Sequence, residues 1–92
     1  MRLTSDTRFV LGEHRVALTL AQEFLAKARA AGLRRWELSG LKYVGALQNS
    51  LGDNVASQQT LEQALTLSRA LQERLDERGI LNSLGITLAQ LD

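Results

Sequence analysis

The chain has 92 residues, 45% of them hydrophobic, with no proline, no cysteine and one histidine. The absence of cysteine excludes disulfides and thiolate chemistry, and a single histidine leaves too few nitrogen ligands for a typical transition-metal site. A formal charge of +1 provides no overall field to attract nucleic acid or an anionic membrane, and no apolar run is long enough to span a bilayer. We therefore expect a soluble, cytoplasmic, all-α domain without a cofactor.

The spacing of apolar residues predicts five helices, in chain order over residues 3–11, 14–31, 37–51, 54–74 and 78–91. Gly32 and Gly52 stand where a helix is expected to end, and glycine readily takes the left-handed conformation that closes a helix. Asp53 or Asn54 can then cap the next helix with a side-chain oxygen. The prediction is of shorter and longer helices in alternation, joined by tight turns.

The sequence repeats itself with a period of forty residues. The residues identical to those forty positions later are Leu11, Gly12, Leu25, Arg29, Ala30, Arg34, Glu37, Leu41, Gly45 and Leu51. Most of these matches fall at glycines, near helix ends or on the apolar face of a helix. The predicted unit is a short helix, a turn and a long helix.

Both kinds of helix carry an apolar face that recurs forty residues later, and we expect both copies to be buried. On the long helices the inward positions are Ala17, Ala21, Phe24, Ala28 and Ala31, then Ser57, Leu61, Ala64, Ser68 and Leu71. On the short helices they are Leu41, Val44, Gly45, Gln48 and Leu51, then Leu81, Leu84, Gly85, Leu88 and Leu91. Glycine costs about 1 kcal/mol inside a helix, so Gly45 and Gly85 are predicted where a long helix passes too close for a side chain.

This pattern resembles the tetratricopeptide repeat, in its longer, forty-residue variety. Gly45 precedes Gly52 by seven residues, and the small residue Ser57 follows five residues after Gly52, as in the family pattern. The chain departs from that pattern at four positions: Leu41 replaces the usual tryptophan, Gln48 an aromatic, Ser57 an alanine, and Asp92 stands where a third turn glycine is expected.

The resemblance implies antiparallel helix hairpins stacked as a short right-handed solenoid, with a part-repeat over residues 1–36, a repeat over 37–76 and a part-repeat over 77–92. Such units normally need about three copies to bury their apolar faces. We therefore expect either that the sequence is a piece of a longer array or that its open ends associate with another copy.

Three candidate chemistries are weaker than a structural explanation. His14 has no second ligand or nucleophile nearby in sequence, so a solvated or capping role is expected. Acidic residues such as Glu62, Glu73, Asp76 and Glu77 accompany no nucleophile or phosphate-binding motif, so we expect helix-surface charges and no enzyme. The segment Arg34-Arg35-Trp36 could contact nucleic acid, but a solvated loop with the tryptophan covering the hairpin is favoured.

The resemblance assigns a binding surface to the remaining face of the short helices, which in tetratricopeptide arrays lines a concave groove for a peptide or helix. Its polar members here are Ser39, Lys42, Tyr43, Asn49, Asn82, Ser83 and Gln90. We expect a non-enzymatic protein-interaction module whose partner is a peptide, a helix or a second copy. The alternative is a regulatory or sensory segment of a larger signalling or transcription-regulating protein.

Overall fold

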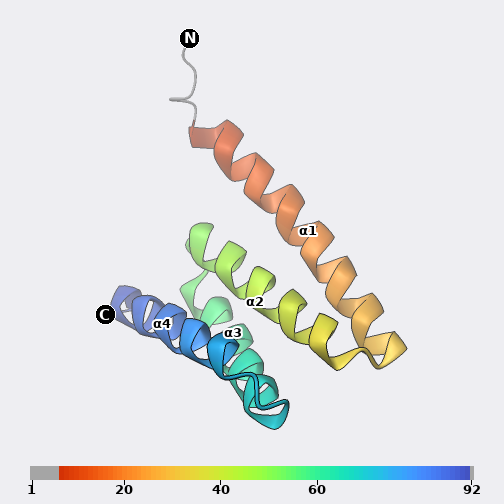
Figure 1. Ribbon diagram of the computed structural model, residues 1–92. Helices are drawn as coiled ribbons and strands as arrows, with labels where there is room; N and C mark the ends of the chain where they lie inside the picture. Colours follow the sequence, from red (N-terminus) through yellow and green to blue (C-terminus); the bar gives the residue numbers. More distant parts are fainter. Residues whose placement is uncertain (1–6, 92) are drawn as a thin grey trace.

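A computed structural model describes the chain from Thr7 to Leu91, and all of this part that is regular is helical (Figure 1). The helices are α1 (Thr7–Ala31), α2 (Arg34–Ser50), α3 (Asn54–Ala70) and α4 (Arg74–Leu91). Each packs on the next one along the chain, and α2 also touches α4. The expected all-α class is confirmed, and α1 and α4 lie at opposite edges of the molecule.

Three turns of the same kind join the helices at intervals of twenty residues. The turn residues Gly32, Gly52 and Gln72 have φ angles of 70°, 84° and 58°. In each turn the next amide donates to the carbonyl five residues back, as Asp53 N does to Gln48 O at 2.9 Å. The predicted helix ends at Gly32 and Gly52 are confirmed, and the Asp53 carboxylate caps α3 by accepting from Ala56 N.

Two predicted boundaries are wrong for identifiable reasons. The predicted break near Gly12 does not exist, because α1 runs through it; residues 3–6 of the first predicted helix lie outside the described range. One glycine costs a helix only about 1 kcal/mol, which an otherwise continuous helix tolerates. The helix predicted to reach residue 74 ends at Ala70, because Gln72 adopts the left-handed conformation without being a glycine.

Two helices begin earlier than predicted. Helix α2 begins at Arg34 where the sequence predicts residue 37, and α4 begins at Arg74 where it predicts residue 78. In consequence α2 and α3 have equal lengths of 17 residues, so the predicted alternation of short and long helices does not hold. The longest helix is α1, with 25 residues, and its N-terminal end extends past α2 (Figure 1).

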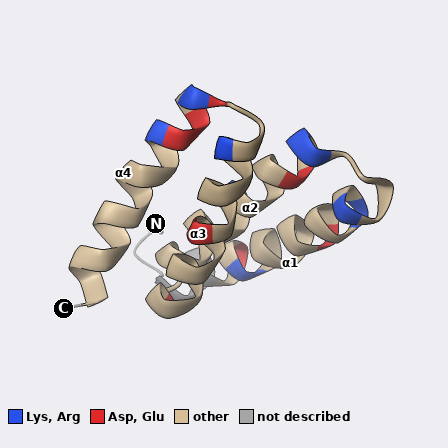
Figure 2. Ribbon diagram, turned by 90° about the horizontal axis from the view of Figure 1, so that it is seen from below, with Lys and Arg blue, Asp and Glu red and all other residues tan. Residues whose placement is uncertain are grey.

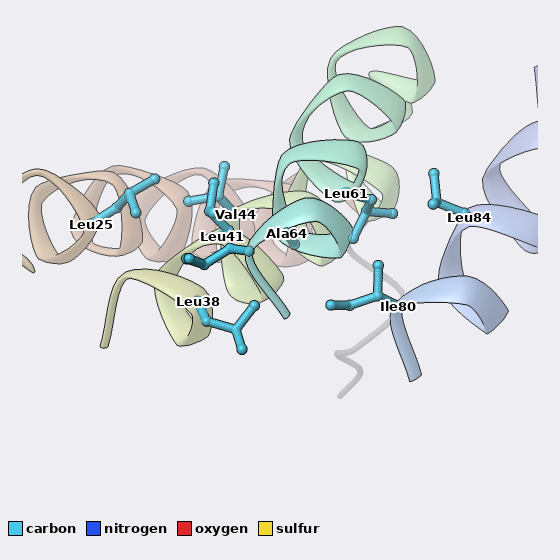
Figure 3. Packing of buried hydrophobic residues seen from close by; sticks show 9 residues of the cluster. Leu25, Leu38, Leu41, Val44, Leu61, Ala64, Ile80 and Leu84 are labelled. Atoms are coloured by element: carbon cyan, nitrogen blue, oxygen red, sulfur yellow. The ribbon is translucent and has the colours of Figure 1, made fainter. Parts of the chain in front are cut away.

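The core lies between successive helices, with α3 in its middle (Figure 3). Leu61 and Ala64 of α3 pack between Leu41 of α2 and Leu84 of α4. The buried apolar residues are Leu25, Ala28, Leu38, Leu41, Val44, Leu61, Ala64, Leu67, Ile80 and Leu84. Most of these residues occupy the inward positions predicted from the apolar faces of the helices. An apolar face of a helix is buried wherever a neighbouring helix covers it.

The predicted face of α2 is covered by α3. Leu41, Val44 and Gly45 are buried, and Gln48 and Leu51 are half-buried. The Ser57 hydroxyl of α3 donates to the Gly45 carbonyl at 2.8 Å, and Thr60 Oγ1 donates to Gln48 Oε1 at 2.7 Å. A Cβ placed on Gly45 would lie 2.7 Å from Leu61 Cδ2, which explains the glycine.

The prediction is wrong at the two edges of the molecule. Of the five predicted inward positions on α4 only Leu84 is buried, whereas Leu81, Gly85, Leu88 and Leu91 are exposed; the other buried residues of this helix are Ile80 and Thr87. On α1, Ala28 is buried and Ala17 and Ala21 are half-buried, but Phe24 and Ala31 are exposed. The neighbouring helices leave the exposed positions at least partly uncovered, so their apolar pattern alone does not bury them. We call Leu81, Gly85, Leu88 and Leu91 the open face of α4.

Candidate functional site

A hollow of about 360 Å³ lies between α2 and α4. It is lined by Ser39, Lys42, Tyr43 and Ala46 from α2, Leu61 from α3, and Gly79, Ile80 and Ser83 from α4. The α2 residues recur at intervals of three and four and therefore share one face of the helix. The small residues Ala46 and Gly79 leave the space between the two helices open.

The hollow brings together four of the predicted site residues, namely Ser39, Lys42, Tyr43 and Ser83. Tyr43 is 65% exposed, although it borders the apolar side chains of Leu61 and Ile80. An exposed aromatic ring with a hydroxyl at its tip can both pack on an apolar group and hydrogen-bond. The two serines add hydroxyl groups that can donate and accept.

The charge of Lys42 is engaged within the chain. Its ammonium group forms an ion pair with the Asp76 carboxylate at the start of α4. Arg35 and Glu73 form a second ion pair between the start of α2 and the turn before α4, with nitrogen and oxygen 3.0 Å apart. These pairs tie α2 to α4 at one end of the hollow, and an acidic ligand would have to compete with Asp76 for Lys42.

The other predicted site residues do not line the hollow. Asn82 and Gln90 are exposed on α4, and Asn49 is half-buried near the C-terminal end of α2. The Asn49 Oδ1 atom is buried and accepts no hydrogen bond from the described residues. The predicted surface is thus divided into a hollow between the middle parts of α2 and α4 and separate polar positions outside it.

Arg34, Arg35 and Trp36 form the first turn of α2, which corrects the expectation of a loop. Arg35 is paired with Glu73, and Arg34 Nε lies 4.0 Å from Glu37 Oε1. Trp36 stands edge-on to Phe24 with ring centroids 5.9 Å apart, so it lies over the hairpin of α1 and α2 as expected. Figure 2 shows basic and acidic residues interleaved at this end of the molecule, which gives no continuous basic stripe.

The same ion pair closes two of the turns, forty residues apart. Arg29 Nε lies 3.4 Å from Glu37 Oε2 across the turn from α1 to α2, and Arg69 Nε lies 3.0 Å from Glu77 Oε2 across the turn from α3 to α4. Arg29 also donates from Nη2 to Gln63 Oε1 at 3.0 Å. The acidic residues near these turns are therefore partners of arginines on the surface.

His14 lies inside α1, and the predicted position in a first turn is wrong because the helix begins at Thr7. Its ring is half-buried, and Nδ1 has no hydrogen-bond partner among the described residues. Within residues 7–91 no three His, Asp or Glu side chains are placed to hold a metal ion. In the same part of the chain, none of the helices has the length and apolar character required to cross a bilayer.

The sequence pattern does not indicate three features of the hollow. These are the ion pair that Asp76 forms with Lys42, the contribution of Gly79, and the presence of Leu61 and Ile80 in the lining. The forty-residue register could have identified Gly79, since it aligns with Ser39. The pairing of Lys42 with Asp76 has no local signal, because the two residues lie on different helices.

Comparisons with protein-family models, with curated proteins and with solved structures found no match to this chain.

Proposed function

We propose that this chain is a non-enzymatic protein-interaction module of tetratricopeptide type, and that the hollow between α2 and α4 receives a segment of a partner protein. In this proposal the helices form hairpins stacked as a short right-handed solenoid, and a cytoplasmic location belongs to the same proposal. The observation that carries it is the hollow itself, with an exposed tyrosine and two serines around an apolar floor.

The recurrence of contacts along the chain supports the stacked arrangement. Turns of one geometry occur at Gly32, Gly52 and Gln72, and the Arg29–Glu37 pair recurs as Arg69–Glu77. In a solenoid of helix hairpins, each unit contacts its neighbours through the same positions. Recurring pairs at a fixed sequence interval are what such an architecture requires.

The chemistry of the hollow favours a peptide or helix with one apolar side chain and nearby backbone or hydroxyl groups. The apolar side chain would enter over Leu61 and Ile80 beside the Tyr43 ring. Ser39 and Ser83 would hydrogen-bond the polar groups that flank it. Because Lys42 is neutralised by Asp76, a strongly charged partner gains little at this site.

A displayed library of random short peptides, selected on the immobilised chain, tests the proposal. Peptides that bind should lose about tenfold or more in affinity for Tyr43→Ala, because an exposed aromatic side chain is a common binding anchor. Ser83→Glu should have a similar effect, because it fills the hollow and adds a charge. Calorimetric titration would measure both losses.

Val55→Ala is the matched control, since Val55 is an exposed apolar residue on α3 that does not line the hollow. It should leave the affinity unchanged, and thermal melting should show all three variants folded. If the library yields no binder, or if the binders tolerate Tyr43→Ala and Ser83→Glu as well as Val55→Ala, the proposed site is wrong.

A further inference from the structure

Two apolar surfaces remain exposed at opposite edges of the molecule. The first is the open face of α4, where Leu88 is 46% exposed and no charged residue occurs between Gly79 and Leu91 (Figure 2). The second is an exposed, mostly apolar face of α1, where Leu20 is 59% exposed. We call this the exposed face of α1, and it consists of Gly12, Glu13, Val16, Ala17 and Leu20.

The forty-residue register relates these two surfaces to the contact between α2 and α3. The residues of the exposed face of α1 align with Gly52, Asp53, Ala56, Ser57 and Thr60. Ser57 and Thr60 are the residues of α3 that hydrogen-bond to Gly45 and Gln48 of α2. The open face of α4 aligns in turn with the face of α2 that α3 covers. The two exposed surfaces thus correspond to the two sides of an interface already present inside the chain.

We propose that a second copy of this chain docks its α1 on the open face of α4, in the way that α3 packs on α2. The contacts expected between copies follow from the contacts within the chain by the forty-residue shift. Each contact between neighbouring elements then predicts one between copies, and the residue types at the shifted positions can be checked for compatibility.

The polar contact between Thr60 and Gln48 becomes an apolar one. Leu20 of the second copy takes the place of Thr60, and Leu88 takes the place of Gln48. Both leucines are largely exposed in the single chain, so docking would remove apolar surface from water on each side.

The ion pair between Arg35 and Glu73 also becomes an apolar contact. Leu75 takes the place of Arg35, and Leu33 of the second copy takes the place of Glu73. Leu75 is 82% exposed and Leu33 50% exposed, so docking would remove apolar surface of both side chains from water. The register therefore matches exposed leucine with exposed leucine at a second, separate place.

The hydrogen bond between Arg29 and Gln63 becomes an ion pair. Arg69 takes the place of Arg29, and Glu23 of the second copy takes the place of Gln63. Arg69 already holds Glu77, as Arg29 holds Glu37, and Glu23 is exposed on α1. The two surfaces therefore have complementary charge where their internal counterpart has a neutral hydrogen bond.

Gly85 has room for the approach of the second copy. A Cβ placed there meets nothing within 4 Å, whereas one on Gly45 would collide with Leu61. Ala21 of the second copy aligns with Leu61, so a smaller side chain would meet Gly85. Because this interface joins different surfaces of the two copies, it does not close at a dimer, and association should continue to longer assemblies.

The test uses the charge variants Leu20→Glu and Leu88→Glu in sedimentation velocity over a range of concentrations. The unaltered chain should form species larger than a dimer as concentration rises. Each variant alone should be monomeric at concentrations where the unaltered chain associates. The dissociation constant of its self-association should rise about tenfold or more, because one of the two docking surfaces carries a charge in every copy. An equimolar mixture of the two variants should form a heterodimer, because the intact α4 surface of Leu20→Glu can bind the intact α1 surface of Leu88→Glu. This heterodimer should grow no further, because the two surfaces left free both carry the added charge.

Ile86→Glu is the matched control, because Ile86 is a similarly exposed residue on α4 that lies outside the open face. It should associate like the unaltered chain, and melting curves should show all variants folded. A monomeric unaltered chain at every concentration would overturn the proposal and leave the open face to another segment or partner. Dimers of either single variant would also overturn it, because they require like surfaces to meet.

This proposal does not depend on a ligand in the hollow between α2 and α4. Tyr43→Ala should leave self-association unchanged while weakening peptide binding about tenfold or more, whereas Leu88→Glu should weaken self-association and leave peptide binding unchanged. The two proposals therefore fail separately.

Discussion

The face of α2 that α3 covers and the open face of α4 have related sequences and opposite environments. Leu41 is buried on the first, and its counterpart Leu81 is exposed on the second. Gly45 lies against Leu61, and its counterpart Gly85 faces open space. The comparison shows that an apolar helix face is a property of the sequence, whereas its burial depends on whether a neighbouring helix is present.

The two faces also differ in polarity in a way that fits their environments. The covered face contains Gln48, which accepts a hydrogen bond from Thr60, so a polar side chain is tolerated there because it has a partner. The open face has Leu88 at that position and no polar side chain among its four residues. The less buried face is thus the more apolar one, which is the reverse of what solvent exposure alone would favour.

The substitutions Gly45→Leu and Gly85→Leu should affect the free energy of unfolding differently. Gly45→Leu should lower the free energy of unfolding by about 1–3 kcal/mol, because a side chain there collides with Leu61. Gly85→Leu should be neutral or stabilising in the monomer, because leucine forms helix better than glycine and has space. Urea unfolding at low protein concentration measures both.

Equal destabilisation by the two substitutions would show that the open face is covered in solution even at low concentration. A neutral Gly45→Leu would contradict the close approach of α3 to α2. Gly45→Ala provides an intermediate step, since its single methyl group would lie 2.9 Å from Leu61 Cγ and 2.7 Å from Leu61 Cδ2 and requires a smaller shift of that side chain than leucine does.

Loss of the Ser57 hydroxyl should weaken the packing of α3 on the covered face of α2, and it also removes the contact of this hydroxyl with Thr87 Oγ1 of α4 at 3.4 Å. Ser57→Ala should lower the free energy of unfolding by about 1 kcal/mol, because the Gly45 carbonyl loses its buried donor. Ser50→Ala is the control, since Ser50 is exposed at the end of α2 and should change stability far less. Thermal and urea unfolding should agree, and an equal loss at Ser50 would indicate a general effect of serine on helix stability.

The fold was predictable from sequence wherever the signal was local. Apolar spacing identified every helix of the described chain, and Gly32, Gly52 and Asp53 marked real turns and a real cap. The pattern failed at Gly12, where a glycine lies inside a helix, and at Gln72, where a turn lacks one. Both errors arise because turn formation depends on packing across the turn, which a single residue does not report.

The site was predictable only in part. Ser39, Lys42, Tyr43 and Ser83 do lie around one hollow, since residues on one face of parallel-running helices come together. Asn49, Asn82 and Gln90 share the helical periodicity but lie elsewhere, because periodicity defines a direction and not a position along the groove. Whether any of these residues binds a partner stays a prediction.

The turn between α3 and α4 should contribute less to stability than the turn between α2 and α3. Gln72, in the turn between α3 and α4, takes the left-handed conformation at φ 58°, which disfavours residues with a Cβ. Gly52, in the turn between α2 and α3, takes the left-handed conformation at φ 84° without that strain. Gln72→Gly should therefore raise the free energy of unfolding by about 0.5–1 kcal/mol. The reciprocal change Gly52→Gln should lower it by a similar amount. Denaturant melts of both variants provide the test, and a loss of stability on Gln72→Gly would mean that the glutamine side chain stabilises the turn.

The smallest effect concerns the arginines that end α1 and α3. Arg29 contacts both Glu37 and Gln63 within the chain. Arg69 contacts Glu77, and the residue that corresponds to Gln63 in the forty-residue register is Glu23, which the proposal supplies from a second copy. Gln63→Glu converts the internal contact into an ion pair, and it should stabilise the monomer by about 0.2–0.5 kcal/mol.

The same change one turn earlier, Gln59→Glu, separates this ion pair from the general effect of an added charge, because Gln59 is exposed on α3 and it is Gln63 that Arg29 contacts. The gain at residue 63 should vanish in about 1 M salt, where exposed charges are screened beyond a few ångströms. If Gln63→Glu destabilises the chain at low salt, the arginine prefers a neutral acceptor at this position. The expected attraction between Arg69 and Glu23 of a second copy would then lose its support, while the two leucine contacts would be unaffected.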